Sequence, residues 1–244
     1  MAADSRPAVS IVIPVYNEER RLPRTLPPVL AYLAAQPFSW EVVCVDDGST
    51  DRTVELVTEM ARRFPQVRLL RMPHRGKGHA VRTGMLAARG SRRFYSDADF
   101  SVSIEDLARF LPVLEEAEVA IGSREAPGAV RYREPLYRHL MGRVYNRLVR
   151  LLILPGIQDT QCGFKGFREE VVEPLFSRQG MEGWGFDVEL LYLARRAGYR
   201  VVEVPVHWTY GQHSRLRPFR DAWRMLADML RVCWKAWTRQ YDLP

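Results

Sequence analysis

The sequence predicts an α/β protein in which a mostly parallel central sheet is flanked by helices. Two observations support this fold class. In the first half of the chain, short apolar runs of strand length alternate with longer segments whose apolar residues recur every three or four positions. Three of these runs lead directly into acidic clusters. Ligands of parallel sheets bind at the carboxyl ends of the strands, where such clusters would lie.

The expected elements follow in order along the chain. Strands are predicted where apolar residues form short runs, at residues 9–15, 40–45, 67–71, 93–96 and 119–122. Helices are predicted in the segments between them, at residues 22–35, 51–64, 77–89 and 104–115. The second half is predicted to hold a basic amphipathic helix, a glycine-containing loop, a helix, a strand and a final basic amphipathic helix, at residues 136–154, 155–167, 187–197, 199–206 and 218–238.

The net charge of +7, from 36 basic and 29 acidic residues in a chain of 244, is unevenly distributed. Segments 124–150 and 215–239 each carry a net charge of +5, so the remainder is slightly acidic. A local excess of arginine indicates a surface for an anionic partner, which is nucleic acid, a phosphorylated ligand or an anionic membrane.

The cysteines and apolar stretches predict a cellular compartment. Cys44, Cys162 and Cys233 are widely spaced and fit neither a disulfide framework nor a zinc pattern. The first ten residues lack the apolar core of a signal peptide. The longest apolar stretch, residues 148–157, is shorter than the roughly 20 residues of a membrane-spanning helix. We therefore expect a cytoplasmic protein without a transmembrane helix.

The first two acidic clusters fit a nucleotide ligand. In VSIVIPVYNEE, Tyr16 and Glu18 follow a strand that stops at Pro14, so a ring and a carboxylate could hold a base and a ribose. A simple strand–helix turn with a capping Asn is the alternative. In VDDGSTD, the adjacent Asp46 and Asp47 place two negative charges close together, and a bound ligand would stabilise them. Carboxylates accept hydrogen bonds from ribose hydroxyls and base N–H groups.

The third cluster, SDADFS, predicts a metal site. Asp97 and Asp99 in Asp-x-Asp spacing at a strand end can face one hard cation. Mg²⁺ or Mn²⁺ typically takes one or two carboxylates together with substrate phosphates, and it would neutralise a departing diphosphate. A fourth motif, RGKGHA at residues 75–80, opens a helix whose N-terminus favours phosphate, although a plain glycine turn would look the same.

Taken in order, these motifs resemble the family 2 inverting glycosyltransferases of GT-A fold. Within them, the chain is similar over about residues 8–230 to the polyprenyl-phosphate sugar transferases, which include dolichyl-phosphate mannose synthases and dolichyl-phosphate β-glucosyltransferases. The stretches DTQCGFK and WGFDVEL, at residues 159–165 and 184–190, are most similar to the glucosyl branch. The resemblance implies transfer of a sugar onto polyprenyl or dolichyl phosphate, with UDP-glucose favoured as the donor and GDP-mannose as the alternative.

The resemblance also implies roles for individual residues. Those matching the donor nucleotide-sugar site are Pro14, Tyr16, Glu18, Val45, Asp47, Asp97, Ala98 and Arg215, and the VDDGSTD and RGKGHA motifs add Asp46 and Lys77 as candidates. The implied ligands of Mg²⁺ or Mn²⁺ are Asp97 and Asp99, with Ser101 as a third candidate where mannose synthases often have a metal-facing Gln. Candidate catalytic residues are Asp99, Arg124, Asp187 and Glu189. Candidate contacts for the acceptor phosphate are Arg124 and Ser214, together with Arg131 and Arg133, which are chosen because the arginine-rich segment 124–150 could bring two negatively charged substrates together.

The chemistry of the acceptor bears on whether a base is needed. Some family members carry a carboxylate at the position of Gly163. A sugar hydroxyl acceptor needs a general base, whereas a phosphate acceptor is already anionic. We therefore expect in-line displacement with inversion and no obligatory base. Asp187 and Glu189 are left with three roles: positioning the sugar, serving as a base, or being acids that the helix dipole favours at a helix N-terminus.

The final predicted helix has the composition of a helix lying on anionic lipid. Large apolar residues recur at spacings of three and four between basic residues, namely Phe219, Trp223, Leu226, Leu230, Trp234 and Trp237. An ordinary surface helix packed on the domain is the alternative. We expect one catalytic domain, with a nucleotide- and metal-binding half at 8–122, an acceptor-binding half at 123–216 and an interfacial helix at 217–244. It would bind peripherally at the inner face of the membrane.

Three other classes of protein compete with this prediction. A nucleic-acid-binding protein would explain the charge, but no known motif for that function is present and the acidic clusters would have no role. A nucleotidyltransferase that makes the sugar nucleotide usually begins with a glycine-rich basic loop, which VSIVIPVYNEE lacks. A catalytically inactive binding module would not need an intact Asp-x-Asp.

Overall fold

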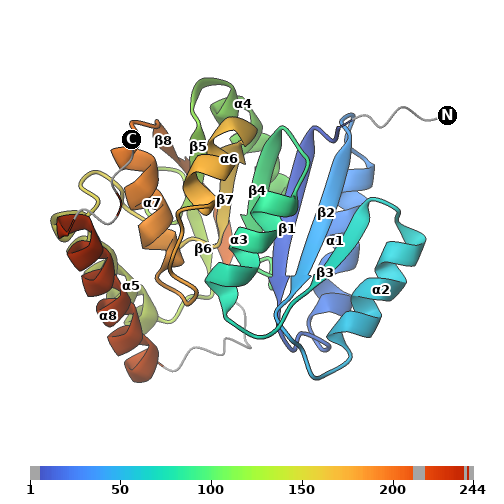
Figure 1. Ribbon diagram of the computed structural model, residues 1–244, viewed down its shortest axis with the longest axis horizontal. Helices are drawn as coiled ribbons and strands as arrows, with labels where there is room; N and C mark the ends of the chain where they lie inside the picture. Colours follow the sequence, from blue (N-terminus) through green and yellow to red (C-terminus); the bar gives the residue numbers. More distant parts are fainter. Residues whose placement is uncertain (1–5, 211–217, 239–240, 242–244) are drawn as a thin grey trace.

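The computed structural model describes residues 6–210, 218–238 and 241, and its main sheet confirms the predicted α/β class. Within that part of the chain, seven strands form the sheet in the order β3-β2-β1-β4-β7-β5-β8 (Figure 1). Their bounds are β1 Val9–Val15, β2 Trp40–Asp46, β3 Val67–Arg71, β4 Arg92–Ser96, β5 Val119–Ser123, β7 Phe164–Arg168 and β8 Val201–Pro205. The strands pair in parallel except β7, which runs antiparallel to both β4 and β5.

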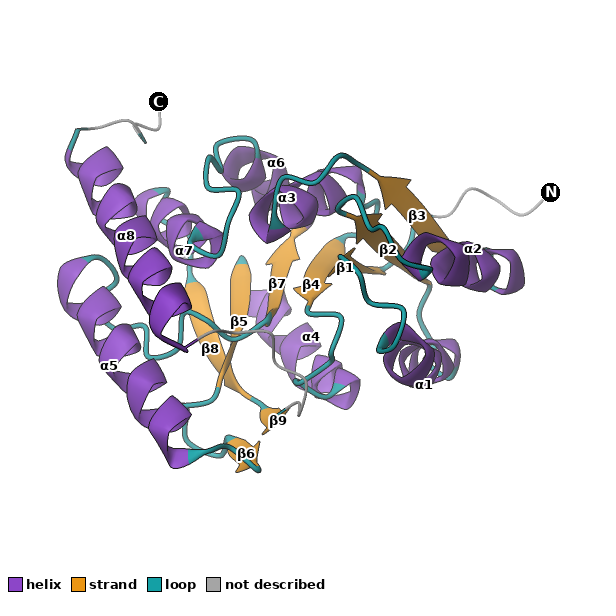
Figure 2. Ribbon diagram, turned by 90° about the horizontal axis from the view of Figure 1, so that it is seen from below, coloured by secondary structure: helices purple, strands orange, loops and turns teal. Residues whose placement is uncertain are grey.

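Helices cover both faces of this sheet (Figure 2). Their bounds are α1 Leu22–Ala34, α2 Thr53–Arg63, α3 Lys77–Ala87, α4 Leu107–Glu116, α5 Leu136–Leu152, α6 Glu169–Phe176, α7 Phe186–Arg196 and α8 Pro218–Trp237. Because side chains alternate along a strand, Val12 of β1 packs with α3, α6 and α7 on one face, while Ile11 and Ile13 pack with α1 and α4 on the other. Burial of each such aliphatic side chain contributes about 1.5–3 kcal/mol to the stability of the fold, so the two layers hold the strands in fixed positions.

Strand β7 corrects the sequence prediction, which assigned residues 155–167 to a loop. The sequence of β7 is Phe-Lys-Gly-Phe-Arg, and neither a charged residue nor a glycine belongs to the usual pattern of a buried strand. Lys165 is nevertheless fully buried. Gly166 allows the strand to lie against an aromatic ring, since a Cβ there would be 2.4 Å from Cε1 of Phe94. Helix α6, which contains Pro174, was likewise not anticipated.

A second, smaller sheet and two long helices lie outside the main sheet, near the end of the molecule where β8 is its last strand. Strands β6 (Val130–Tyr132) and β9 (His207–Thr209) pair in parallel. Helices α5 and α8 lie side by side at one end of the molecule in both views (Figures 1 and 2). Among the described residues, every helix is too short or too polar to span a bilayer.

Candidate active site

The motifs singled out in the sequence meet at one edge of the main sheet. Parallel pairing brings together the carboxyl ends of β1, β2, β4 and β5, and the antiparallel β7 begins at the same edge. Tyr16, Asp47, Asp97 and Arg124 therefore follow four strands at this edge, and Gly163 immediately precedes β7. The expected clustering of strand-end groups is found in the structure.

Asp97 and Asp99 stand at the centre of this edge. The backbone N–H of Asp97 donates to the carbonyl oxygen of Gly163 at 3.1 Å, which ties the Asp-x-Asp segment to the start of β7. Gly163 also leaves the space that the carboxylate occupies, because a Cβ there would lie 2.3 Å from Oδ2 of Asp97. The absence of a side chain at position 163 is thus a steric requirement of the first aspartate. Ala98 between the two acids is buried, and its carbonyl oxygen accepts a hydrogen bond from Thr25.

A lysine faces the first of these carboxylates. Nζ of Lys77 lies 2.5 Å from Oδ1 of Asp97 and forms an ion pair with it. Burial lowers the pKa of Lys77, but the carboxylates of Asp97 and Asp187 raise that pKa by more, so the ammonium stays charged. Burial and the negative charge of Asp97 raise the pKa of Asp99 above its ordinary value. Two crowded carboxylates and one cation leave the site short of positive charge.

The residues present fit a divalent metal ion. Oδ1 of Asp97 is buried with the ammonium of Lys77 as its ion-pair partner, and the donor set of the two aspartates is carboxylate oxygen, which Mg²⁺ and Mn²⁺ prefer. No cluster of three or more acidic, His or Cys ligands occurs among the described residues. Mg²⁺ in nucleotide sites is commonly bound by one or two carboxylates together with substrate phosphates. Ser101, the third candidate ligand, holds Asp99 in place. Its backbone N–H donates to Oδ1 of Asp99 at 3.0 Å, and its side chain also hydrogen-bonds that carboxylate.

Tyr16 and Glu18 lie at the end of β1 as expected. The ring of Tyr16 stacks on His74 with centroids 4.3 Å apart, and 37% of the Tyr16 side chain remains exposed. Glu18 accepts a hydrogen bond from the guanidinium of Arg21 at 2.9 Å. Between them, Asn17 adopts a positive φ of 53° and accepts a hydrogen bond from the backbone N–H of Thr50. The β1 and β2 ends are therefore locked to each other.

The two acids at the end of β2 hold loops. Asp46 accepts a hydrogen bond from the backbone N–H of Ser49. Asp47 is buried and accepts hydrogen bonds from the backbone N–H groups of Arg75 and Gly76, at 2.8 and 2.9 Å. Its carboxylate also pairs with His74 at 2.8 Å. These contacts account for the crowded charges without a ligand.

Two further donor-site candidates lie on strands β1 and β2. The side chain of Val45 is fully buried in the core, so any contact of Val45 with a ligand would come from its backbone. Pro14, near the end of β1, is partly exposed.

The glycines of the RGKGHA motif allow the backbone of residues 181–182 to pack closely against the start of α3. A Cβ at Gly76 would lie 2.6 Å from the carbonyl oxygen of Glu182, and one at Gly78 would lie 2.5 Å from that of Met181. The N–H groups of Gly78 and His79 both donate to the Glu182 carbonyl oxygen, at 2.7 and 3.3 Å. The expected phosphate position at this helix N-terminus is therefore filled by the chain itself, and Lys77 is the group that the motif directs to the site.

Arg124, after β5, is held by a partner that the sequence did not reveal. Its guanidinium donates to both oxygens of Asp159 at 2.7 and 2.8 Å, and its backbone N–H donates to the same carboxylate at 3.0 Å. Asp159 is fully buried, and although burial raises its pKa, the charge and hydrogen bonds of Arg124 lower it below the usual range. This pair fixes the first residue of the DTQCGFK stretch at the site edge.

The other two acceptor-phosphate candidates differ from each other. The guanidinium of Arg131 pairs with Glu125 and Glu134 at 2.5 Å each, and its Nε donates to the carbonyl oxygen of Arg124. Arg131 is thus engaged within the protein. Arg133 adopts a positive φ of 60°, is exposed, and makes no hydrogen bond or ion pair with residues 6–210, 218–238 or 241. Arg133 is the better placed of the two for an external phosphate.

Asp187 and Glu189 are both buried and engaged. Asp187 accepts hydrogen bonds from the buried ammonium of Lys165 and from the hydroxyl of Tyr95. Glu189 accepts hydrogen bonds from the backbone N–H groups of residues 180 and 181 at 2.9 and 2.7 Å, and from the hydroxyl of Tyr241 at 2.6 Å. Ser214 and Arg215, predicted for the acceptor and donor sites, lie outside the described residues.

Three contributors to this edge were missed by the sequence predictions. His74 shows no pattern of its own, and Lys165 lies in the segment expected to be a loop. Asp159 was noted only as part of a stretch. An acid that opens a loop near a basic segment is a weak signal, and only the fold reveals the pairing with Arg124.

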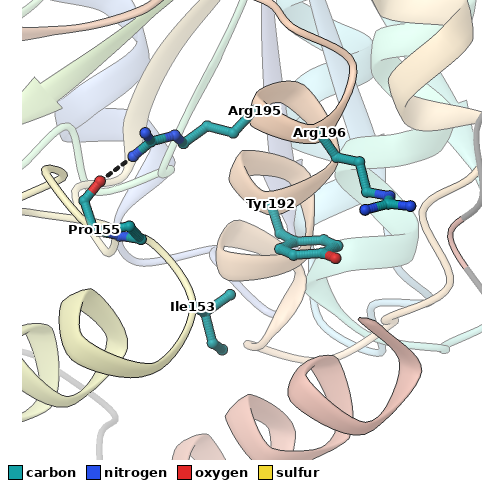
Figure 3. A pocket seen from close by; sticks show the side chains of 5 residues that line it. All are labelled: Ile153, Pro155, Tyr192, Arg195 and Arg196. Carbon is teal, nitrogen blue, oxygen red and sulfur yellow. Dashed lines mark hydrogen bonds between the residues drawn. The ribbon is translucent and has the colours of Figure 1, made fainter. Parts of the chain in front are cut away.

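Two cavities in the described part of the chain lie away from this edge. One of about 300 Å³ is lined by Ile153, Pro155, Tyr192, Arg195 and Arg196, between the end of α5 and helix α7 (Figure 3). Arg195 donates to the carbonyl oxygen of Pro155 there. A second, of about 790 Å³, lies at the opposite edge of the sheet, where β2 begins. The chemistry-bearing groups are at the carboxyl edge, so neither cavity is the candidate active site.

Comparison with known proteins agrees with this site. The family model described as glycosyl transferase family 2 matches residues 10–176. A dolichyl-phosphate β-glucosyltransferase of Drosophila melanogaster is 38% identical over 241 residues, covering 92% of this chain and 74% of that protein. One of Homo sapiens is 35% identical over 238 residues, covering 91% and 74%. The chain therefore belongs to glycosyl transferase family 2.

The fold has relatives among solved structures. A glucosyl-3-phosphoglycerate synthase of Mycobacterium tuberculosis, in complex with Mn²⁺, UDP and glucosyl-3-phosphoglycerate, superimposes with a TM-score of 0.66 at 20% identity, covering 93% of this chain and 80% of that one. Family and fold together confirm the predicted class of enzyme, a glycosyltransferase of GT-A fold. They favour it over the nucleic-acid-binding alternative.

Proposed function

We propose that this glycosyltransferase moves a glucosyl residue from UDP-glucose onto a polyprenyl phosphate such as dolichyl phosphate, with Mg²⁺ or Mn²⁺, at a membrane surface. The relatives named above support the acceptor and the sugar. The UDP-bound structural relative supports a uridine nucleotide and a divalent metal. The geometry of the candidate base residues supports an acceptor that is already anionic.

The main observation behind the proposal is that both candidate bases, Asp187 and Glu189, already accept hydrogen bonds or form ion pairs within the protein. Asp187 is paired with Lys165, and Glu189 accepts two backbone N–H groups and the hydroxyl of Tyr241. Gly163 offers no side chain, and a Cβ there would collide with Asp97. An alcohol acceptor would need a base to remove its proton, whereas a phosphate monoester needs none. These residues suit a phosphate acceptor.

In the proposed mechanism, the side chains at the sheet edge bind and orient the two substrates. Tyr16 and Glu18 would contact the nucleoside, and Asp46 and Asp47 would keep the surrounding loops in register. Lys77 would contribute positive charge beside the diphosphate, because its ammonium is already held at Asp97. Asp97 and Asp99 would hold the metal, which when bound supplies charge to stabilise the departing diphosphate.

The acceptor phosphate would enter beside β5 and β6. Arg124 is fixed there by Asp159, and Arg133 is exposed nearby. Two negatively charged substrates must approach each other for in-line attack at the anomeric carbon. Arginine in this region lowers that repulsion, and orientation by the protein reduces the entropic part of the barrier.

The membrane part of the proposal depends on α5 and α8. Leu140, Val144 and Leu148 of α5 recur every four residues, and their side chains are 64%, 53% and 38% exposed. Trp234 and Trp237 of α8 are also exposed, at 56% and 84%. An exposed apolar stripe among arginines is the composition of a helix that lies on anionic lipid. We propose peripheral binding at the cytoplasmic face, with the lipid acceptor entering along this surface.

A donor screen tests the proposal. The purified protein is incubated with polyprenyl phosphate, Mn²⁺ or Mg²⁺, and either UDP-glucose, UDP-galactose or GDP-mannose, and lipid-linked product is measured. We expect product with UDP-glucose and loss of product with Asp97→Asn or after chelation of the metal. Product only with GDP-mannose would replace the glucosyl assignment by a mannosyl one. No product with any donor would contradict the proposed function.

A further inference from the structure

The stretch WGFDVEL contains one large residue that packing does not explain. Trp184 lies at the sheet edge with 44% of its side chain exposed. Phe186, two residues later, is fully buried in the core. A tryptophan left half in water keeps a large apolar ring surface available for contact with a ligand.

Trp184 stands next to the predicted metal site. Nζ of Lys77 lies 5.1 Å from the centroid of the Trp184 ring, and the same nitrogen lies 2.5 Å from Oδ1 of Asp97. One lysine side chain thus separates the indole from the Asp-x-Asp carboxylates. The ring borders the region into which a diphosphate held at those carboxylates would extend its sugar.

The loop that carries Trp184 is fixed on both sides. Glu189 accepts the backbone N–H groups of Gly180 and Met181, and the carbonyl oxygen of Glu182 accepts two N–H groups from the start of α3. The amide of Gln179 donates to the carbonyl oxygens of Gly78 and Met181 at 2.8 and 3.0 Å.

The C-terminal side of this loop is closely packed as well. Gly185 lies against α8, because a Cβ there would be 2.5 Å from Cβ of Asp228. A side chain presented on a loop braced in this way loses little conformational entropy when it contacts a ligand.

We propose that Trp184 is a specificity-determining residue that forms an apolar platform for the hexose of the sugar-nucleotide donor. The face of a hexopyranose that carries axial C–H groups is apolar and fits the face of an aromatic ring, while its hydroxyl groups remain at the rim. Lys77 lies against the indole and next to the diphosphate position. The platform therefore belongs to the donor side of the site and contacts the part of the donor that UDP lacks.

The inference rests on the proposed UDP-glucose donor, so its test compares a nucleotide that carries the hexose with one that lacks it. Binding of UDP-glucose and of UDP, each with Mn²⁺ and without lipid acceptor, is measured by isothermal titration calorimetry. The proteins are wild type, Trp184→Ala and Trp184→Phe. Phe38→Ala, a truncation of a partly buried aromatic residue at the opposite edge of the sheet, is the matched control.

We expect Trp184→Ala to weaken UDP-glucose about tenfold and to change UDP affinity by less than about twofold, with Trp184→Phe between alanine and wild type. Phe38→Ala should leave the ratio of the two affinities unchanged. An equal loss for both ligands, or no loss for either, would overturn the platform. So would an unchanged affinity ratio accompanied by a raised KM for polyprenyl phosphate, since the ring would then contact the lipid. Wild type that binds neither ligand would instead refute the proposed donor.

Discussion

Replacing Gly163 by alanine should change metal affinity and transfer rate much more than it changes stability. The new Cβ would lie 2.3 Å from Oδ2 and 2.6 Å from Cγ of Asp97. Restoring an ordinary contact of about 3.4 Å requires the carboxylate to move by about 1 Å. The carboxylate is the end of a flexible side chain that is 35% exposed, so we expect the free energy of unfolding to change by less than about 1 kcal/mol.

The same movement should be costly for function. A displacement of about 1 Å in a group that orients substrate can reduce the rate about 100-fold, and disturbance of a metal ligand's surroundings typically weakens metal affinity about 10- to 100-fold. Mn²⁺ affinity by calorimetry, transfer rate and urea denaturation would be measured on the same preparation. Gly163→Ala with wild-type Mn²⁺ affinity and rate would refute the assignment of Asp97.

A matched control lies three residues further along the chain, within strand β7. Alanine at Gly166 would place its Cβ 2.4 Å from Cε1 of Phe94, within the hydrophobic core. Overpacking of this kind costs about 1–3 kcal/mol of stability. We therefore expect the reverse result for Gly166→Ala, with reduced stability and an unchanged affinity of the folded protein for Mn²⁺.

Other substitutions test the remaining parts of the account. Asp159→Asn should lower the free energy of unfolding by about 3–5 kcal/mol, because the buried guanidinium of Arg124 loses its counter-charge, and a loss below about 1 kcal/mol in urea denaturation would contradict this. Asp99→Asn should raise the free energy of unfolding at neutral pH in metal-free buffer. The pKa of Asp99 is raised in the folded protein, so wild type loses stability as the pH rises from the ordinary pKa of 3.8 through the raised one, and Asn does not ionise. A variant less stable than wild type at pH 7 would refute this. Leu140→Asp should reduce co-sedimentation with anionic vesicles without lowering the melting temperature, because the side chain is 64% exposed, and undiminished sedimentation would exclude α5 from the membrane surface.

The order of strands and helices in the first half could be predicted because the strands are short apolar runs and longer segments of helical pattern separate them. Strand β1 buries every side chain except that of Pro14, and α1 buries Leu22, Leu26, Val29, Leu30 and Leu33 on one stripe. Strand β7 could not be predicted in this way. Lys165 is buried there with a counter-charge from Asp187 of α7 and a hydrogen bond to the carbonyl oxygen of Cys162, and neither contact leaves a pattern in the sequence.

The candidate site was predictable in its location but only partly in its contacts. Parallel pairing brings strand ends together whatever the loops do, so Asp97, Asp99 and Arg124 could be gathered from the sequence. Which acids are engaged elsewhere depends on loops that pack across the sheet edge. Asp47 holds the backbone of residues 75–76, and Glu189 holds that of residues 180–181, and neither contact leaves a pattern in the sequence.

Two acceptors that differ only in the phosphate show whether the site works without a base. Transfer from UDP-glucose, with Mn²⁺, is measured to dolichyl phosphate and to dolichol in the same detergent. Because Asp187 and Glu189 are engaged and Gly163 has no side chain, we expect product with dolichyl phosphate and none with dolichol. Comparable transfer to the alcohol would show that a base operates at this site and would contradict the account.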